Sequence, residues 1–181
     1  MTSTLTLIHS FALSIRGLGA CVGLATLLFL TSASDASAGP SKPANSAKIK
    51  VVAVGGSAIT TLTSLAFNED GTIAIEAVQV GRLSHFGEFT GQFSYVAIPS
   101  ATTTLLQGNA TLTNEDGDQL YITAAIVEQG ADYPYTVTGV LTITGGTGRF
   151  EKSTGLVAVT GMDTASPTDA LKLRGTLILE K

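Results

Sequence analysis

The sequence predicts an all-β protein, an antiparallel up-and-down β-barrel of eight strands, or of nine if every β-type segment forms its own strand. From Lys48 onward, runs rich in Val, Ile, Thr and Leu are separated by Gly, Asn, Asp and Pro, and no window keeps a helical period. Several runs alternate apolar and polar residues, which gives a strand one apolar face. Many such strands joined by short turns are expected to curl around a common core.

Nine β-type segments can be placed along the chain. They are expected near residues 48–54, 58–67, 72–80, 88–98, 103–113, 118–128, 135–144, 155–161 and 171–179. In the last one, Leu171 and Leu173 share a face while Lys172 and Arg174 share the other. Glycines inside the strands are predicted to mark bends and close packing rather than ligand contacts. These glycines are Gly91, Gly108, Gly139 and Gly175.

Two turns carry the same four residues. Asn-Glu-Asp-Gly occurs at 68–71 and again at 114–117, each time between two β-type runs. Asp followed by Gly suits the positive φ angles of a tight hairpin. Both turns are therefore predicted to join antiparallel neighbours.

The N-terminal segment has the layout of a secretory signal peptide. Arg16 precedes an apolar run from Leu18 to Leu30, and small residues ending at Ala38 follow it. This run is shorter than the roughly 20 residues that a membrane-spanning helix needs. We expect residues 1–38 to be a signal peptide cleaved after Ala38, residues 39–47 a flexible lead-in, and residues 48–181 the barrel of a secreted or periplasmic protein. Two alternatives are lipidation at Cys21 and an uncleaved anchor over residues 5–30.

Composition excludes several classes of function. Cys21 is the only cysteine of the chain, so a protein cleaved after Ala38 has no disulfide and no thiolate chemistry. The formal net charge is −4, and the basic residues are scattered, which argues against nucleic-acid binding. His85 is the only histidine beyond the leader, and one histidine cannot make a zinc site. No metal and no cofactor is expected.

The glycine-rich run 143–151, ITGGTGRFE, is the most informative motif. It looks like a dinucleotide-binding turn, but only 30 residues follow Glu151 and no helix-forming sequence comes next. We interpret it as the corner between two strands. The alternation predicts that Phe150 plugs the barrel end while Arg149 and Glu151 face water.

This run resembles the turn of the barrel family that includes allene oxide cyclases and dirigent proteins, a calycin-like barrel. The residues that match are Ile143, Gly145, Gly146, Thr147, Gly148, Phe150, Glu151 and Gly155. Segments 81–91 and 117–124 also look like segments of bacterial relatives that accompany this turn. The resemblance implies an eight-stranded barrel with a cavity open at one end, often assembled as a trimer.

The resemblance carries over no catalytic residue. Plant cyclases of this family place a Glu, Asn residues and a Pro near the start of the barrel, whereas segments 48–56 and 57–67 contain none of them. The remaining candidates are therefore polar residues that could face the cavity. His85 and Glu76 are candidates for catalysis, and Tyr95, Tyr121 and Arg82 are candidates for ligand binding. Tyr133 and Tyr135 could line the cavity mouth or pack in the core.

Three functions remain open. The first is an exported barrel with a non-catalytic binding or structural role, which holds a small hydrophobic ligand in the barrel. The second is an isomerase or cyclase that guides an apolar substrate. The third is a small outer-membrane barrel, which the 6% aromatic content and the absence of Trp disfavour. We expect a barrel domain that does not span a membrane, with a hydrophobic ligand and further copies of the chain as partners.

Overall fold

The computed structural model describes residues 48–164 and 170–180. The predicted signal peptide and lead-in lie outside the described residues. Within these residues lie, in chain order, eight strands and one short 3-10 helix: β1 (Ile49–Phe67), β2 (Ile73–Leu83), β3 (Gly87–Pro99), β4 (Thr103–Asn114), β5 (Gln119–Gln129), β6 (Tyr135–Gly146), η2 (Gly148–Phe150), β7 (Thr154–Asp163) and β8 (Ala170–Glu180).

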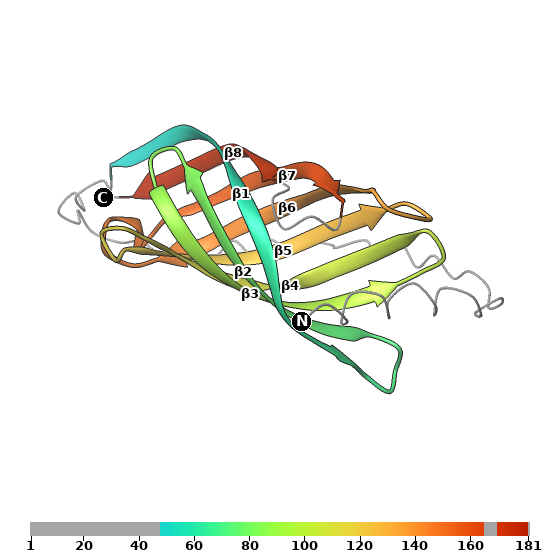
Figure 1. Ribbon diagram of the computed structural model, residues 1–181. Helices are drawn as coiled ribbons and strands as arrows, with labels where there is room; N and C mark the ends of the chain where they lie inside the picture. The colour runs from blue at the N-terminus through green and yellow to red at the C-terminus, as the bar shows by residue number, and fades with distance from the viewer. Residues whose placement is uncertain (1–47, 165–169, 181) are drawn as a thin grey trace, which may run out of the picture. The chain divides into compact units, whose positions relative to one another are not determined.

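The eight strands form a closed antiparallel barrel (Figure 1). Each strand pairs with the next one along the chain, and β1 pairs with β8 to close the sheet. The predicted fold class is therefore confirmed. Among the described residues, no helix is both long enough and apolar enough to cross a membrane.

Segments 48–54 and 58–67, predicted as two strands, form the single strand β1. Its first half pairs with β8, from Ile49 to Ile59, and its second half pairs with β2, from Gly56 to Phe67. The chain stays extended through Gly55 and Gly56 because both pair with β8, and residues from Gly56 to Ile59 pair with β2 as well. The nine predicted segments thus give eight strands.

The apolar face of the strands points into the barrel and is closely packed. Strand β3 shows strict alternation, with buried residues at Phe89, Gly91, Phe93, Tyr95 and Ala97. The glycines inside the strands make room for neighbouring backbone, as predicted. A Cβ at Gly108 would lie 2.0 Å from the carbonyl oxygen of Ser94, and one at Gly175 would lie 2.0 Å from that of Leu156.

The glycine-rich run 143–151 closes one end of the barrel, which we call the plugged end. Phe150 lies in η2 and is 1% exposed, and its ring meets that of Phe86 edge-on at 5.0 Å between centroids. Gly148 adopts φ +55°, in the left-handed region that favours glycine. The prediction that Phe150 plugs the barrel is confirmed.

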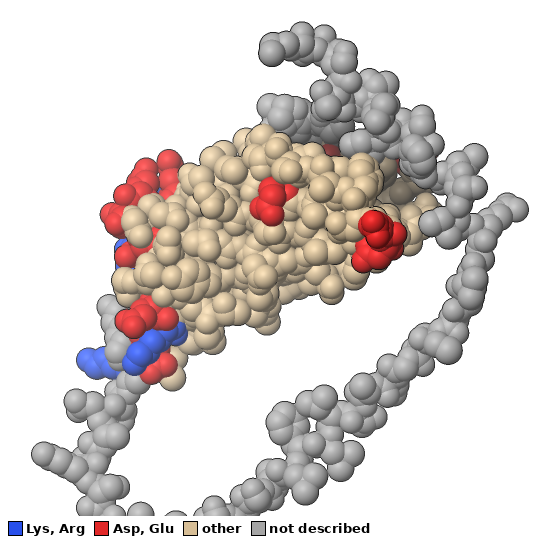
Figure 2. Space-filling view, turned by 90° about the horizontal axis from the view of Figure 1, so that it is seen from below, with Lys and Arg blue, Asp and Glu red and all other residues tan. Residues whose placement is uncertain are grey.

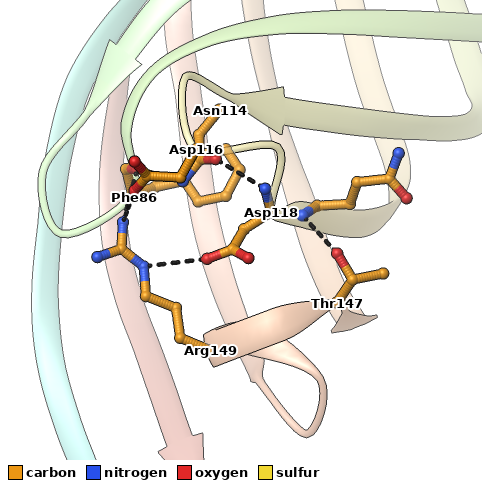
Figure 3. A network of polar contacts seen from close by, with 7 residues as sticks. Phe86, Asn114, Asp116, Asp118, Thr147 and Arg149 are labelled. Atoms are coloured by element: carbon orange, nitrogen blue, oxygen red, sulfur yellow. Dashed lines mark hydrogen bonds and ion pairs between the residues drawn. The ribbon is translucent and has the colours of Figure 1, made fainter.

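Polar contacts link this plug to the neighbouring turns (Figure 3). Arg149 points toward the β4–β5 turn, where its Nε lies 3.4 Å from Asp118 and its Nη2 lies 3.6 Å from Asp116. The side chain of Asn114 donates to the carbonyl oxygen of Phe86 at 3.1 Å. Arg149 was expected simply to face water. It is instead half exposed and paired, because the barrel brings two distant turns together at this end.

Candidate functional site

The end of the barrel opposite the plug holds a group of ionisable side chains, which we call the carboxylate end. Tyr95, Glu128, Tyr135 and Asp163 occupy positions in β3, β5, β6 and β7 that follow the interior-facing alternation of their strands. Tyr135 and Asp163 are direct partners across β6 and β7. Four strands therefore supply two carboxyl groups and two phenols to one end of the barrel.

Aromatic packing fixes the tyrosines at this end. The Tyr95 ring stacks on Phe93 with centroids 5.5 Å apart, and Tyr95 is 5% exposed. Tyr133, in the connection before β6, packs on Tyr135 with centroids 4.4 Å apart. Gly130 leaves space for the Tyr135 ring, since a Cβ there would come within 2.8 Å of it.

Burial shifts the titration of the groups at the carboxylate end. The loss of solvation, followed by the nearby charge of Asp163, raises the pKa of Glu128 to about 7. Burial and then the charge of Glu128 raise the pKa of Tyr95 well above its usual value. Burial and then Asp163 raise the pKa of Tyr133 to about 12. Near neutral pH, Glu128 is present in both protonation states while the two phenols keep their protons.

An apolar lip lies at the same end of the barrel. The β1–β2 hairpin, drawn in green, projects beyond the rest of the barrel in Figure 1. On the hairpin, Leu62 and Phe67 pair with positions on the interior-facing side of β2 and remain 53% and 72% exposed. Ile73 and Ile75 lie on the same side and pack against the core. The carboxylate end thus combines a half-buried acid with exposed apolar surface.

The candidates named from the sequence lie in several different places. Tyr95 faces the interior at the carboxylate end. Glu76 and Tyr121 lie on the outer wall, where both line an open hollow of about 400 Å³. Arg82 lines a second open hollow on the outer wall, of about 590 Å³. His85 lies in the β2–β3 turn at the plugged end and adopts φ +67°.

Sequence reasoning missed Glu128 and Asp163. A signal for each was present, because Glu128 continues the alternation of Leu120, Ile122, Ala124 and Ile126 toward the interior. Asp163 continues the alternation of Val157 and Val159 in the same way. An acid in phase with the apolar face of a strand is a stronger candidate than one out of phase with it.

The donor set for a metal ion is absent from the part of the chain that the structure describes. Among residues 48–164 and 170–180, no three His, Cys, Asp or Glu side chains form a group that could hold a metal ion.

No family model matches the chain, and no curated protein sequence matches it. A search of solved structures found the pterocarpan synthase dirigent protein, at 15% sequence identity and a TM-score of 0.46. The match covers 76% of this chain and 90% of that one.

Proposed function

We propose that the protein binds a small hydrophobic molecule with a neutral oxygen-containing head group at the carboxylate end. The observation that carries this proposal is Glu128, a partly buried carboxyl group beside Tyr95 on the interior side of the barrel, with a pKa raised to about 7. A protonated carboxyl and a phenol both donate hydrogen bonds, so they suit a carbonyl, hydroxyl or ether oxygen. The lip formed by Leu62 and Phe67 offers apolar surface for the rest of the molecule.

Displacement of a neutral fluorescent probe, N-phenyl-1-naphthylamine, tests this proposal on the purified protein. A long-chain methyl ketone and the alkane of equal length serve as competitors. We expect the ketone to bind more tightly, and to lose that advantage as the pH rises through 7 and Glu128 loses its proton. Phe67→Ala should weaken both competitors, and Glu128→Ala should weaken the ketone alone.

The matched control is Leu156→Ala, which removes a side chain that is 58% exposed on the outer wall. It should leave both competitors unchanged. Failure of the probe and both competitors to bind, or equal effects of Leu156→Ala and Phe67→Ala, would contradict the proposal.

A second candidate function is the isomerase or cyclase. Glu128 favours it, because a carboxyl group with a pKa near the working pH can both give and take a proton. In this case Glu128 would protonate the oxygen of an apolar substrate such as an allylic epoxide while the barrel end holds its chain in one conformation. Chiral chromatography of the cyclised product tests it: an identical enantiomer ratio with and without protein would reject it.

Export and assembly are part of the same proposal. Arg16, the apolar run 18–30 and the small residues up to Ala38 support cleavage after Ala38. Intact-mass measurement of the exported protein checks this, since a mature chain that begins at Gly39 is expected. The resemblance to cyclases and dirigent proteins supports a homo-oligomer, a trimer, which light scattering behind a sizing column would measure.

A further inference from the structure

The outward face of strands β2 to β6 carries an ordered set of polar side chains. Two rows of cross-strand neighbours form it, the first in the order Glu76, Ser94, Asn109 and Thr123, the second in the order Gln92, Thr111 and Tyr121. Neighbouring strands lie about 4.8 Å apart, and residues on one face recur about every 6.8 Å along a strand. The two rows, together with Thr144 of β6, form a grid that we call the polar wall.

The polar wall lines the hollow of about 400 Å³ already described. Strands β3, β4 and β5 form its floor at Phe93, Ala110 and Ile122. Among the described residues that line the hollow, Glu76 carries the single charge, and the others are amides, hydroxyls or apolar groups. Figure 2 shows a face of the barrel on which charged side chains gather mainly at the ends and uncharged residues cover most of the wall.

Tyr121 supplies an aromatic surface at the edge of this hollow. It is 40% exposed, and its hydroxyl donates to Gln119 at 3.3 Å, which positions the ring. Tyr121 of β5 pairs with Gly145 of β6, which has no side chain to cover the ring. A bulge in β6 inserts Thr144 beside it, and the Thr144 hydroxyl donates to the carbonyl oxygen of Tyr121 at 3.2 Å.

These side chains match the surface of a sugar. Amides and hydroxyls both donate and accept hydrogen bonds, as the hydroxyl groups of a sugar do. Glu76 accepts a hydrogen bond from Ser94 at 2.8 Å through Oε1, and its second carboxylate oxygen can accept one from a ligand. An exposed tyrosine ring offers an apolar, flat face with a polar tip, which suits the C–H face of a sugar ring.

Other occupants fit the polar wall less well. A purely apolar ligand would bury the amides of Gln92 and Asn109 without hydrogen-bond partners, which costs free energy. An anionic polymer would approach Glu76 with no Lys or Arg among the described lining residues to attract it. An interface between copies of one chain is more apolar at its centre than this surface.

We propose that the polar wall is a binding site for a neutral oligosaccharide, which lies across strands β2 to β6 on the outside of the barrel. Glu76, Asn109 and Gln92 would hydrogen-bond to its hydroxyl groups, and one sugar ring would stack on Tyr121. This site lies on the face opposite to the interior of the barrel. It is therefore independent of ligand binding at the carboxylate end.

Titration with four neutral oligosaccharides tests the proposal: cellopentaose, laminaripentaose, maltopentaose and penta-N-acetylchitopentaose. Backbone amide shifts in a two-dimensional NMR spectrum of the full barrel report the site. We expect at least one of the four to shift amides in the middle of β3, β4 and β5, with little dependence of the affinity on salt because the ligand is neutral. Tyr121→Ala should lower that affinity at least tenfold, and Asn109→Ala should lower it severalfold.

Val140→Ala is the matched control, because Val140 is 43% exposed on the outer wall and does not line the hollow. It should leave the affinity unchanged, and circular dichroism would show that all variants keep the β-sheet spectrum. Any of three results would overturn the proposal: no shift with any of the four sugars at millimolar concentration, an unchanged affinity in Tyr121→Ala, or shifts at the polar wall that depend on protein concentration alone. The last result would assign the surface to a second copy of the chain.

Discussion

Replacing Glu128 by Gln is expected to change how stability depends on pH. Glutamine keeps the size of the side chain and removes its charge. The folded protein holds the pKa of Glu128 at about 7, whereas the ordinary value is 4.5. Between these two pH values the folded protein therefore binds more protons than the unfolded chain, and the stability of the wild type falls as pH rises.

The magnitude follows from the shift in pKa. A change from 4.5 to about 7 is about 2.5 units, and each unit corresponds to about 1.4 kcal/mol. Ionised Glu128 should thus cost the wild type about 3 kcal/mol above pH 7, and nothing below pH 4.5. Glu128→Gln should match the wild type near pH 4 and exceed its free energy of unfolding by about 3 kcal/mol near pH 9.

Urea unfolding at unit steps from pH 4 to pH 9 measures this difference, with the slope of the free energy against urea checked for constancy. Glu151→Gln provides the control, because Glu151 is exposed beside η2. In an Asp163→Asn background, replacing Glu128 by Gln should raise the free energy of unfolding at high pH by less than it does in the wild type. The reason is that the charge of Asp163 is the second cause of the raised pKa of Glu128. A difference in free energy of unfolding that is the same at every pH, or that grows toward low pH, would refute the assignment of Glu128 as a partly buried acid.

Three further predictions concern what holds the barrel together. Phe150→Ala should destabilise the protein by about 3–5 kcal/mol, because it empties a fully buried site; a loss below about 1 kcal/mol on thermal unfolding would show that the plug does not support the fold. Arg149→Gln should cost less than about 1 kcal/mol despite two ion pairs, because the Arg149 side chain is 53% exposed to solvent; a larger loss in urea unfolding, abolished by salt, would contradict this. Gly108→Ala should cost about 1–3 kcal/mol through the clash with backbone, whereas Gly55→Ala, where a Cβ meets its nearest atom at 3.8 Å, should cost far less; equal losses would count against the packing argument.

Local features of the sequence explain why the fold class could be predicted. Alternation in β3 and β8 shows which residues face inward, and it needs no knowledge of the partner strand. The two Asn-Glu-Asp-Gly turns place Gly71 and Gly117 at positive φ, as the hairpin prediction requires. The burial of Phe150 followed from the same alternation.

The continuity of β1 could not be predicted in this way. Gly55 and Gly56 normally interrupt a strand, and the local sequence supports a break. The strand continues because β8 covers its first half and β2 covers its second half. These partners lie at opposite ends of the barrel sequence, so only closure of the sheet brings them together.

The sequence by itself therefore determined the class of fold, the inward and outward faces of most strands, and the glycine corner that closes one end. Each of these depends on residues close together in the chain. The tertiary structure decided which side chains share a region: Glu128 with Asp163 and Tyr95 at one end of the interior, and Glu76 with Tyr121 along one hollow on the wall outside. These groupings depend on strand register and on the curvature of the closed barrel, which set distances between residues far apart in the sequence.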